Sequence, residues 1–196
     1  MHAALDTALR LNPDLLLARW AKFLTPRDKF FASRAEIGRY IADWDAGCAA
    51  FAARDLEAPA LRPRLEGLLL AQCNFHLAYS GIDVTSRQIA LGQILRRMAT
   101  SAFPQFDAPP RPAPLTGRKL RIGFLTATLR HHTVLKLFGG LMRRLPRDRF
   151  EIHAYALETG SDAVTEQLRR ELDLVRTDIG PLAVMAQRIR DDACDA

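Results

Sequence analysis

Two adjacent histidines, His131 and His132, are the residues best placed for chemistry in this 196-residue chain. They follow a short apolar segment, residues 120–125, and precede Thr133, which can cap a helix. A histidine in such a position can act as a general base or hydrogen-bond a phosphate, and the amides that open a helix form a weak anion site. The alternative is a surface-loop dipeptide with no role, and spacing alone leaves both interpretations open.

The loop that carries the histidines lacks the motifs of two common kinds of site. Its sequence, TATLRHH, contains no glycine, which argues against a dinucleotide-binding fingerprint. No G-x-S-x-G nucleophile elbow and no Ser/His/Asp order is visible elsewhere in the chain.

The cysteines predict neither a metal site nor a disulfide framework. Cys48, Cys73 and Cys194 are far apart, odd in number and without metal-ligand spacing. We therefore expect reduced, partly buried thiols in a cytoplasmic protein.

Two further groups of polar residues predict structure rather than catalysis. His153 should alternate outward on a strand. Asp191, Asp192 and Asp195 are closely clustered and should form the solvated end of a helix rather than a pair of catalytic carboxylates.

Composition and charge exclude two classes of partner. The net charge is +6 and the isoelectric point about 9.7, but no basic patch is interleaved with aromatic residues, so we expect no nucleic-acid partner. No apolar run approaches the roughly eighteen residues that a membrane span needs, and polar residues interrupt the first twenty positions, so we expect no membrane segment and no signal peptide.

The histidines belong to a region, residues 119–196, in which strand and helix patterns alternate. Such alternation implies right-handed crossovers and a parallel sheet, so we predict a partial Rossmann-like α/β lobe whose carboxyl edge carries the histidines. The predicted strands are residues 120–125, 150–155 and 174–179, and the predicted helices are residues 134–145, 162–172 and 183–189. Residues 191–196 read as the approach to a fourth strand. Three strands would leave an exposed edge, so we expect a longer chain or self-association through that edge.

An α-helical region, residues 1–102, precedes the α/β region. Ser33 and Glu36 have capping-box spacing, and Gly81 fits a helix C-cap. The apolar stripe of the helix that starts after Ser33 should be core rather than a ligand platform. One largely buried helix is expected over residues 65–79. Residues 103–118 contain five prolines and should form a stiff linker.

Several stretches of the sequence resemble a known protein family. In chain order they are NFHLAYSGID, KLRIGFLTATLRHHTV, LMRRLPRDRFEIHAYALETGSD and AQRIRDDACDA, which together cover roughly residues 70–196. They resemble the start of the catalytic region in the SPINDLY and O-linked N-acetylglucosamine transferase family. In addition, ALRLNPDLLLARW resembles the junction between two tetratricopeptide helix pairs, although an array needs about three repeats.

The resemblance implies the incomplete amino-terminal lobe of a two-lobed GT-B glycosyltransferase. Such an enzyme moves a sugar from a UDP-sugar to Ser or Thr of an acceptor protein, or to Asn in a related branch, and no metal cofactor is expected. His132 matches the family's active-site histidine, and we expect His131 and Thr133 beside it to contact substrate. Thr128 stands where the family usually has an acidic residue, and Lys136 replaces a second histidine found in some members.

The family holds UDP mainly through a second lobe that includes a lysine, so we expect the 196 residues alone to be inactive and to bind UDP weakly. A second hypothesis is a non-enzymatic interaction module whose helical part binds a partner and whose α/β part is a remnant. A third hypothesis is a nucleotide-responsive regulator of the flavodoxin-like class. The lack of acidic residues after the first strand argues against it.

Overall fold

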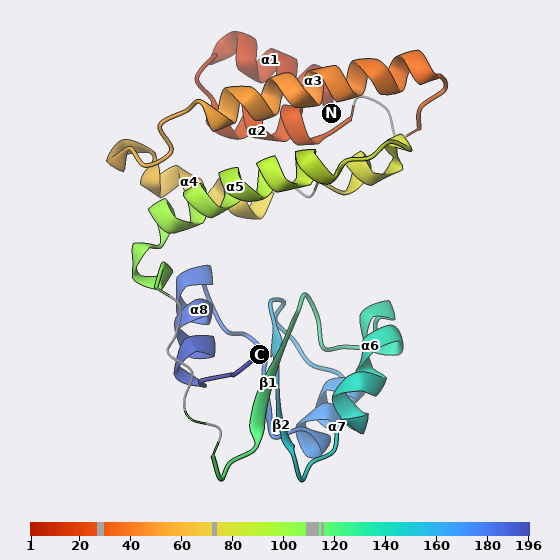
Figure 1. Ribbon diagram of the computed structural model, residues 1–196, viewed down its shortest axis with the longest axis vertical. Helices are drawn as coiled ribbons and strands as arrows, with labels where there is room; N and C mark the ends of the chain where they lie inside the picture. The colour runs from red at the N-terminus through yellow and green to blue at the C-terminus, as the bar shows by residue number, and fades with distance from the viewer. Residues whose placement is uncertain (27–29, 72–73, 109–113, 115) are drawn as a thin grey trace. The chain divides into compact units, whose positions relative to one another are not determined.

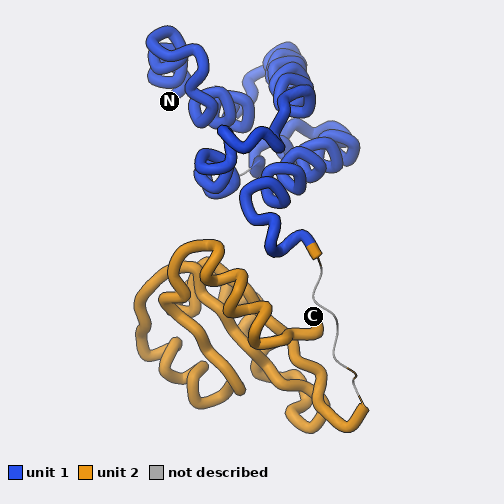
Figure 2. Tube along the Cα trace, turned by 90° about the vertical axis from the view of Figure 1, so that its left-hand side faces the viewer, with its two compact units in different colours: residues 1–107 blue, residues 108–196 orange. Residues whose placement is uncertain are grey.

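The structure is a computed structural model that describes residues 1–26, 30–71, 74–108, 114 and 116–196. The chain divides into two compact units, Met1–Asp107 and Ala108–Ala196 (Figure 2). The first is helical, and the second contains a parallel sheet, so the predicted succession of a helical region and an α/β region is confirmed (Figure 1). Of the predicted linker, residues 104–106 form a 3-10 helix at the end of the helical unit, while residues 109–113 and 115 lie outside the described residues.

Five α-helices and three short 3-10 helices make up the described part of the helical unit. They are α1 (His2–Leu11), α2 (Leu16–Leu24), α3 (Arg34–Ala52), η1 (Pro59–Leu61), α4 (Arg62–Ala71), η2 (Phe75–Ser80), α5 (Thr85–Ala102) and η3 (Pro104–Phe106). The predicted cap of α3 is confirmed, because the Ser33 hydroxyl accepts a hydrogen bond from the Glu36 amide at 3.2 Å. The Glu36 carboxylate reaches back to the Ala32 amide at 2.7 Å, which satisfies a second donor ahead of the helix.

The prediction of one buried helix over residues 65–79 is wrong. Helix α4 ends at Ala71, and the chain resumes as the 3-10 helix η2, on which Phe75 and Tyr79 are 59% and 65% exposed. The Asn74 side chain, directly ahead of η2, accepts a hydrogen bond from the Trp44 indole at 3.0 Å. This tertiary contact ties the segment to α3. The predicted C-cap at Gly81 is confirmed by its left-handed φ of 71°.

Aromatic side chains fill the centre of the helical unit. The Trp20 and Phe51 rings lie 4.8 Å apart and edge-on, and the Phe23 and Trp44 rings lie 5.1 Å apart. The stripe predicted as core on α3 is confirmed as buried at Tyr40, Ile41, Trp44, Cys48 and Phe51. A packed aromatic cluster therefore joins helices α2 and α3.

Gly47 allows α2 and α3 to approach closely, and we predict that Gly47→Ala destabilises the helical unit. A Cβ at this position would lie 2.6 Å from Phe23 Cδ2 and 2.9 Å from Phe23 Cβ, so the two helices would have to separate. Overpacking of this kind costs about 1–3 kcal/mol, from which the better helix propensity of alanine subtracts up to about 1 kcal/mol. Urea unfolding followed by tryptophan fluorescence measures the loss, because both tryptophans lie in this core.

Gly38 offers the matched control on the same helix. Nothing lies within 4 Å of the place where its Cβ would stand, so Gly38→Ala should stabilise the unit by about 0.5–1 kcal/mol. Equal effects of the two substitutions would show that the packing of Gly47 against Phe23 is not tight.

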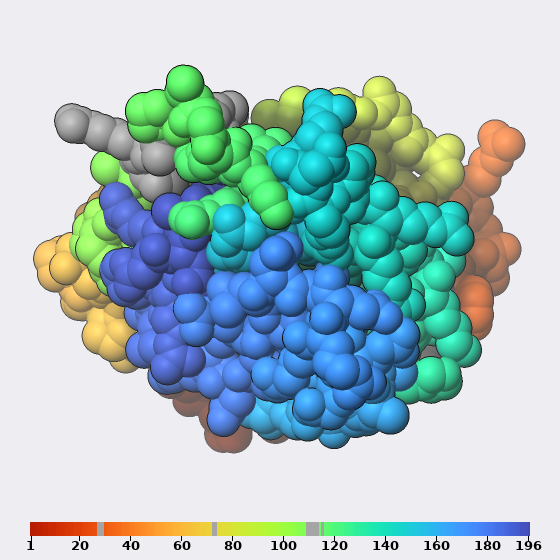
Figure 3. Space-filling view, turned by 90° about the horizontal axis from the view of Figure 1, so that it is seen from below, coloured from red at the N-terminus to blue at the C-terminus, as the bar shows by residue number. Residues whose placement is uncertain are grey.

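The α/β unit is a three-stranded parallel sheet in the order β1-β2-β3. Its elements are β1 (Leu120–Thr126), α6 (Thr133–Arg144), β2 (Phe150–Ala156), α7 (Ala163–Glu171), β3 (Leu174–Arg176) and α8 (Leu182–Asp191). The register pairs Leu120 with Phe150 and Thr126 with Ala156. Because all strands begin at one end, the turns that lead into β1 and β2 lie side by side there, with α7 beside them (Figure 3).

Helices cover both faces of the sheet. On one face, Leu135 and Met142 of α6 and Leu168 of α7 pack in one cluster with Ile152 and Ala154 of β2. On the other face lies α8 (Figure 1), whose Met185 packs with Tyr155. The crossovers β1-α6-β2 and β2-α7-β3 therefore use one face, and the chain changes face at α8.

The last residues of the chain pair with the other edge of β1. The Ala196 amide donates to the Arg121 carbonyl at 3.3 Å, and the Ala196 carbonyl accepts from the Gly123 amide at 2.7 Å. Bonds to residues on either side of Ile122 are the pattern of a parallel ladder. Residues 191–196, which were predicted to approach a fourth strand, thus end by pairing with β1, and this part of one sheet edge is occupied within the chain.

Candidate functional site

The loop after β1 lies at the carboxyl edge of the sheet, where β1 is flanked by β2 on one side and by the C-terminal segment on the other. This is a topological switch point, the place at which open α/β sheets usually bind ligands. The predicted site residues His131, His132 and Thr133 all lie there, at the junction of the loop and α6. All three are exposed.

Contacts with the loop after β2 hold the β1 loop in place. The Leu157 amide donates to the Thr126 carbonyl at 3.0 Å, and the Glu158 amide donates to the Ala127 carbonyl at 2.9 Å, so the ladder continues past the ends of the strands. Arg130 and Glu158 form an ion pair at 2.9 Å. Both loops are thereby joined into one rim.

Asp162, which sequence reasoning missed, clamps the loop. One carboxylate oxygen caps α7 by accepting from the Val164 and Thr165 amides at 2.9 and 3.0 Å, and the other accepts from the His131 amide at 2.7 Å. The His131 amide is the main cause that lowers the Asp162 pKa, followed by the Thr165 amide. The Thr165 hydroxyl donates to the Leu129 carbonyl at 2.9 Å. The spacing of Asp162 and Thr165, which is that of a capping box, was the signal in the sequence that could have identified Asp162.

His132 is the N-cap of α6, and the prediction that Thr133 caps this helix is wrong. His132 has extended backbone angles, φ −149° and ψ 159°, and its Nδ1 accepts a hydrogen bond from the Val134 amide at 3.3 Å. Thr133 is the first helical residue. Because Nδ1 accepts, the neutral imidazole carries its proton on Nε2, which is left to donate to a ligand.

The neighbours of His132 have simpler roles. The His131 backbone is fixed by Asp162, while its imidazole makes no hydrogen bond to any described residue. Thr128, at the position where the resemblance leads one to expect an acid, is buried, and its hydroxyl accepts from the Arg130 amide at 3.3 Å. Lys136 is exposed on the first turn of α6.

This edge of the sheet could bind an anion, with Nε2–H of His132 as an oriented hydrogen-bond donor. Within the part of the chain that the structure describes, the Val134 amide bonds His132 Nδ1 and the Leu135 and Lys136 amides bond the His132 carbonyl, so the Thr133 amide and the Nε2 proton of His132 are the donors left for an oxyanion. The Arg130 charge is balanced by Glu158. Among the described residues, no group of three or more His, Cys, Asp or Glu side chains is placed to hold a metal ion.

A buried polar network lies on the face of the sheet that α8 covers. It shows that two predictions, for His153 and for Asp192, are wrong. His153 points inward and is 5% exposed, with Nε2 2.8 Å from Glu151. Asp192 is not a solvated helix end, because its side chain is 11% exposed and pairs with Arg176 at 2.5 and 2.7 Å. It also accepts from the Tyr155 hydroxyl at 2.9 Å.

Asp195 is likewise engaged rather than solvated. Its carboxylate pairs with Arg118 at 2.6 and 2.7 Å and accepts from the Arg121 amide at 2.9 Å. These bonds fix the C-terminal segment against β1, and the Arg118 pair, as the first cause, holds the Asp195 pKa well below its usual range. Asp191 alone is exposed, as predicted for all three aspartates.

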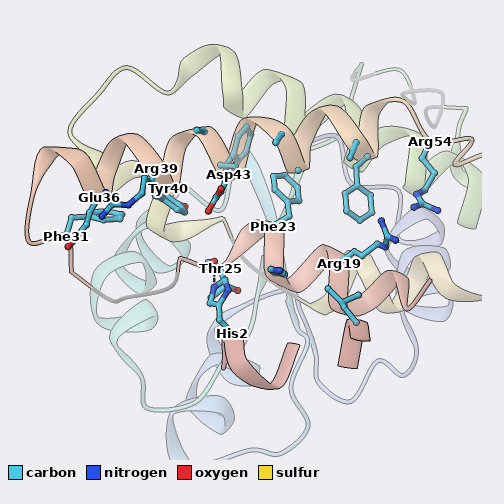
Figure 4. Close-up of a pocket in the computed structure, with 18 residues that line it drawn as sticks. His2, Arg19, Phe23, Thr25, Phe31, Glu36, Arg39, Tyr40, Asp43 and Arg54 are labelled. Carbon is cyan, nitrogen blue, oxygen red and sulfur yellow. Dashed lines mark hydrogen bonds between the residues drawn. The ribbon is translucent and has the colours of Figure 1, made fainter. Parts of the chain in front are cut away.

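A second candidate site lies in the helical unit, in a groove of about 780 Å³ between α1, α2 and α3 (Figure 4). Its lining includes aromatic rings from the core, Phe23, Tyr40 and Phe51, and the cationic residues Arg39 and Arg54. The sequence predicted the α3 stripe as core rather than as a ligand platform. Part of the stripe belongs to the core and also lines the groove, because the α3 side chains that pack against α2 form one wall of it.

No family model matches the chain, and no curated protein matches it either. Among solved structures, the chain is similar to a Thermobaculum terrenum O-GlcNAc transferase carrying a K341M substitution. The identity is 21% and the TM-score 0.49, over 99% of this chain and 34% of that one. The chain therefore spans about a third of the length of that enzyme.

No helix among the described residues is both long and apolar enough to traverse a lipid bilayer.

Proposed function

We propose that residues 119–196 form the first part of a glycosyltransferase lobe and that the rim carrying His132 faces a UDP-sugar. The observation that supports this most directly is the position of His132. It is exposed and caps the first helix after the first strand, at the switch point of a parallel sheet, with Nδ1 engaged by the Val134 amide and the proton of the neutral ring on Nε2. The resemblance of the surrounding sequence to the SPINDLY and O-linked N-acetylglucosamine transferase family supplies the substrate class.

The proposed reaction joins a sugar to a Ser or Thr hydroxyl of an acceptor protein. The acceptor oxygen bonds to the anomeric carbon, the bond from that carbon to the diphosphate oxygen breaks, and the acceptor proton is released. Negative charge builds on the departing UDP. A donor already aimed at that charge lowers the barrier without reorganising, and Nε2–H of His132 is such a donor.

The capping bond argues for this donor role over that of a general base. For Nε2 to accept a proton, the neutral ring would have to move its proton to Nδ1, which would break the bond to the Val134 amide. We therefore assign to His132 a hydrogen bond to a phosphate or sugar oxygen, with His131 and Thr133 as neighbouring contacts. The proposal includes no metal.

Transfer of a labelled sugar tests the proposal in the full-length protein in which these residues occur. A panel of UDP-sugars would be incubated with Ser- and Thr-containing peptides, and incorporation followed by mass spectrometry. We expect transfer from one donor and a decrease of about a hundredfold in His132→Asn. Absence of transfer from every UDP-sugar in the panel would overturn the proposal.

Calorimetry on the 196-residue chain gives an independent check. Because the resemblance places most donor contacts in a second lobe, we expect UDP to bind this chain with a dissociation constant of about 1 mM or weaker. Tight binding of UDP would contradict this assignment of the donor contacts.

The alternative function, a non-enzymatic interaction module, is favoured by a separate observation. The helical unit holds a groove lined by cations and by buried polar atoms that have no partner among the described residues. Ligand binding there without sugar transfer by the full-length protein would favour this alternative.

A further inference from the structure

We propose that the groove of the helical unit, lined by α1, α2 and α3, binds an extended peptide segment that carries two acidic side chains about six residues apart. The site lies wholly in the helical unit and does not depend on the proposed glycosyltransferase function.

Two buried polar atoms in the groove lack partners. The Tyr40 side chain is 8% exposed, and its hydroxyl has no hydrogen bond to any described residue. Burial raises its pKa to about 12, so the hydroxyl keeps its proton and can donate. Nε2 of His2 lies 2.8 Å from the Thr25 carbonyl, which can only accept, so Nδ1 is a buried acceptor, and it too is unpaired among the described residues.

Leaving such buried atoms unpaired is unfavourable, so a ligand that satisfies both gains affinity. The pair consists of one donor and one acceptor. A peptide backbone offers the complementary set at every residue, since its carbonyl accepts and its amide donates. In Figure 4, Tyr40 and Asp43 point from α3 toward the part of the groove where His2 and Thr25 lie.

The shape of the groove fits one extended chain. Its lining follows α3 from Glu36 to Phe51, a length of about 22 Å at 1.5 Å per residue, and also includes Arg54 just after the helix. A volume of about 780 Å³ spread over that length leaves a channel only one chain wide. An extended segment of about seven residues would fill it at 3.3 Å per residue.

The charges that line the groove indicate which side chains the bound peptide should carry. Of the four cations that line the groove, Lys22 pairs with Asp6 at 2.6 Å and Arg19 bonds the Pro13 carbonyl at 2.6 Å. Arg39 has no hydrogen bond or ion pair to any described residue, and Arg54 contacts only the Phe51 ring through its guanidinium, at 6.0 Å.

Arg39 lies in the first half of α3 and Arg54 just after its end (Figure 4), and the helix from Arg39 to Ala52 spans about 20 Å. In an extended peptide, residues six positions apart span about 20 Å and share a face, so two glutamates at that spacing can each meet one arginine. Asp43 lies between the two arginines and should exclude a third acidic side chain from the middle.

Fluorescence anisotropy tests the proposal on the whole chain. The probe is a fluorescein-labelled peptide of about twelve Gly, Ser, Ala and Thr residues with two glutamates about six residues apart. We expect saturable binding that weakens with salt, and a loss of about tenfold or more when both glutamates become glutamine or are placed two residues apart. Equal affinity for all three peptides would overturn the proposal.

Matched variants separate the groove from general charge. Arg39→Gln and Arg54→Gln should each weaken binding about tenfold, whereas Arg64→Gln, which removes an exposed arginine outside the groove, should leave it unchanged. Tyr40→Phe should weaken binding about threefold to tenfold while the urea midpoint of the free protein stays the same or rises, because a buried unpaired hydroxyl is removed. Equal losses in the Arg64 variant, or an unchanged affinity in all the groove variants, would refute the site.

Discussion

Replacing His132 by asparagine should lower turnover of the full-length protein about a hundredfold while leaving its stability within about 0.5 kcal/mol of the wild type. Asparagine is a favoured N-cap and can take over the bond that His132 Nδ1 accepts from the Val134 amide. Its shorter side chain does not reach the place of Nε2, so the proposed donor to the departing diphosphate is lost. Removal of one such donor costs about a hundredfold or more in the catalytic constant.

Alanine at the same position separates capping from catalysis. His132→Ala loses both the cap and the donor, so it should lower turnover as much as asparagine does and also cost up to about 1 kcal/mol of stability. Steady-state kinetics with a UDP-sugar and urea unfolding measure the two effects. Unchanged turnover in the asparagine variant would remove His132 from the mechanism, and the histidine would then be a structural cap alone.

The α/β part of the fold could be predicted because its signals are local. Apolar runs of seven or fewer residues alternate with stripes at spacing three and four, and the strands and helices follow from that pattern. The capping of α6 could not be settled in the same way. His132 and Thr133 are adjacent and both can accept from a helix amide, and only the extended backbone at His132 decides between them.

Predictions failed where a partner distant in sequence determines the outcome. Strand β2 has helices on both faces, so both alternating sets of its side chains are buried and alternation could not place His153 outside. The hydrogen bond from the Trp44 indole to Asn74 joins segments thirty residues apart. The apolar pattern of residues 65–79 could not predict this bond. The clamp on the site has the same origin, since Asp162 meets the His131 amide thirty-one residues away.

Asp192→Asn should destabilise the α/β unit by about 2–3 kcal/mol at pH 7. The carboxylate holds Arg176 of β3 through two hydrogen bonds and accepts from the buried Tyr155 hydroxyl of β2, so it joins two strands to the end of α8. Removing one partner of a buried pair costs about 3–5 kcal/mol, and this value is lowered here because Arg176 is 38% exposed and can return to water.

The same substitution should change how stability depends on pH. The bond from Arg176 is the main cause that lowers the Asp192 pKa in the folded protein. A carboxyl whose pKa is depressed on folding contributes stability above its unfolded pKa of about 3.9, and this contribution is lost as the pH falls from there toward the folded pKa. The difference between wild type and Asp192→Asn should therefore be full at pH 7 and shrink below about pH 4.

Urea unfolding followed by far-ultraviolet circular dichroism at pH 7 and at pH 3 measures this difference, and Asp191→Asn is the matched control. Asp191 is exposed, and among the described residues its side chain bonds only Gln187, so its replacement should change stability by less than about 0.5 kcal/mol at either pH. Because both tryptophans lie in the helical unit, tryptophan fluorescence reports that unit separately. If Asp192→Asn and Asp191→Asn unfolded at the same urea concentration at pH 7, the Arg176–Asp192–Tyr155 network would contribute nothing to holding α8 against the sheet.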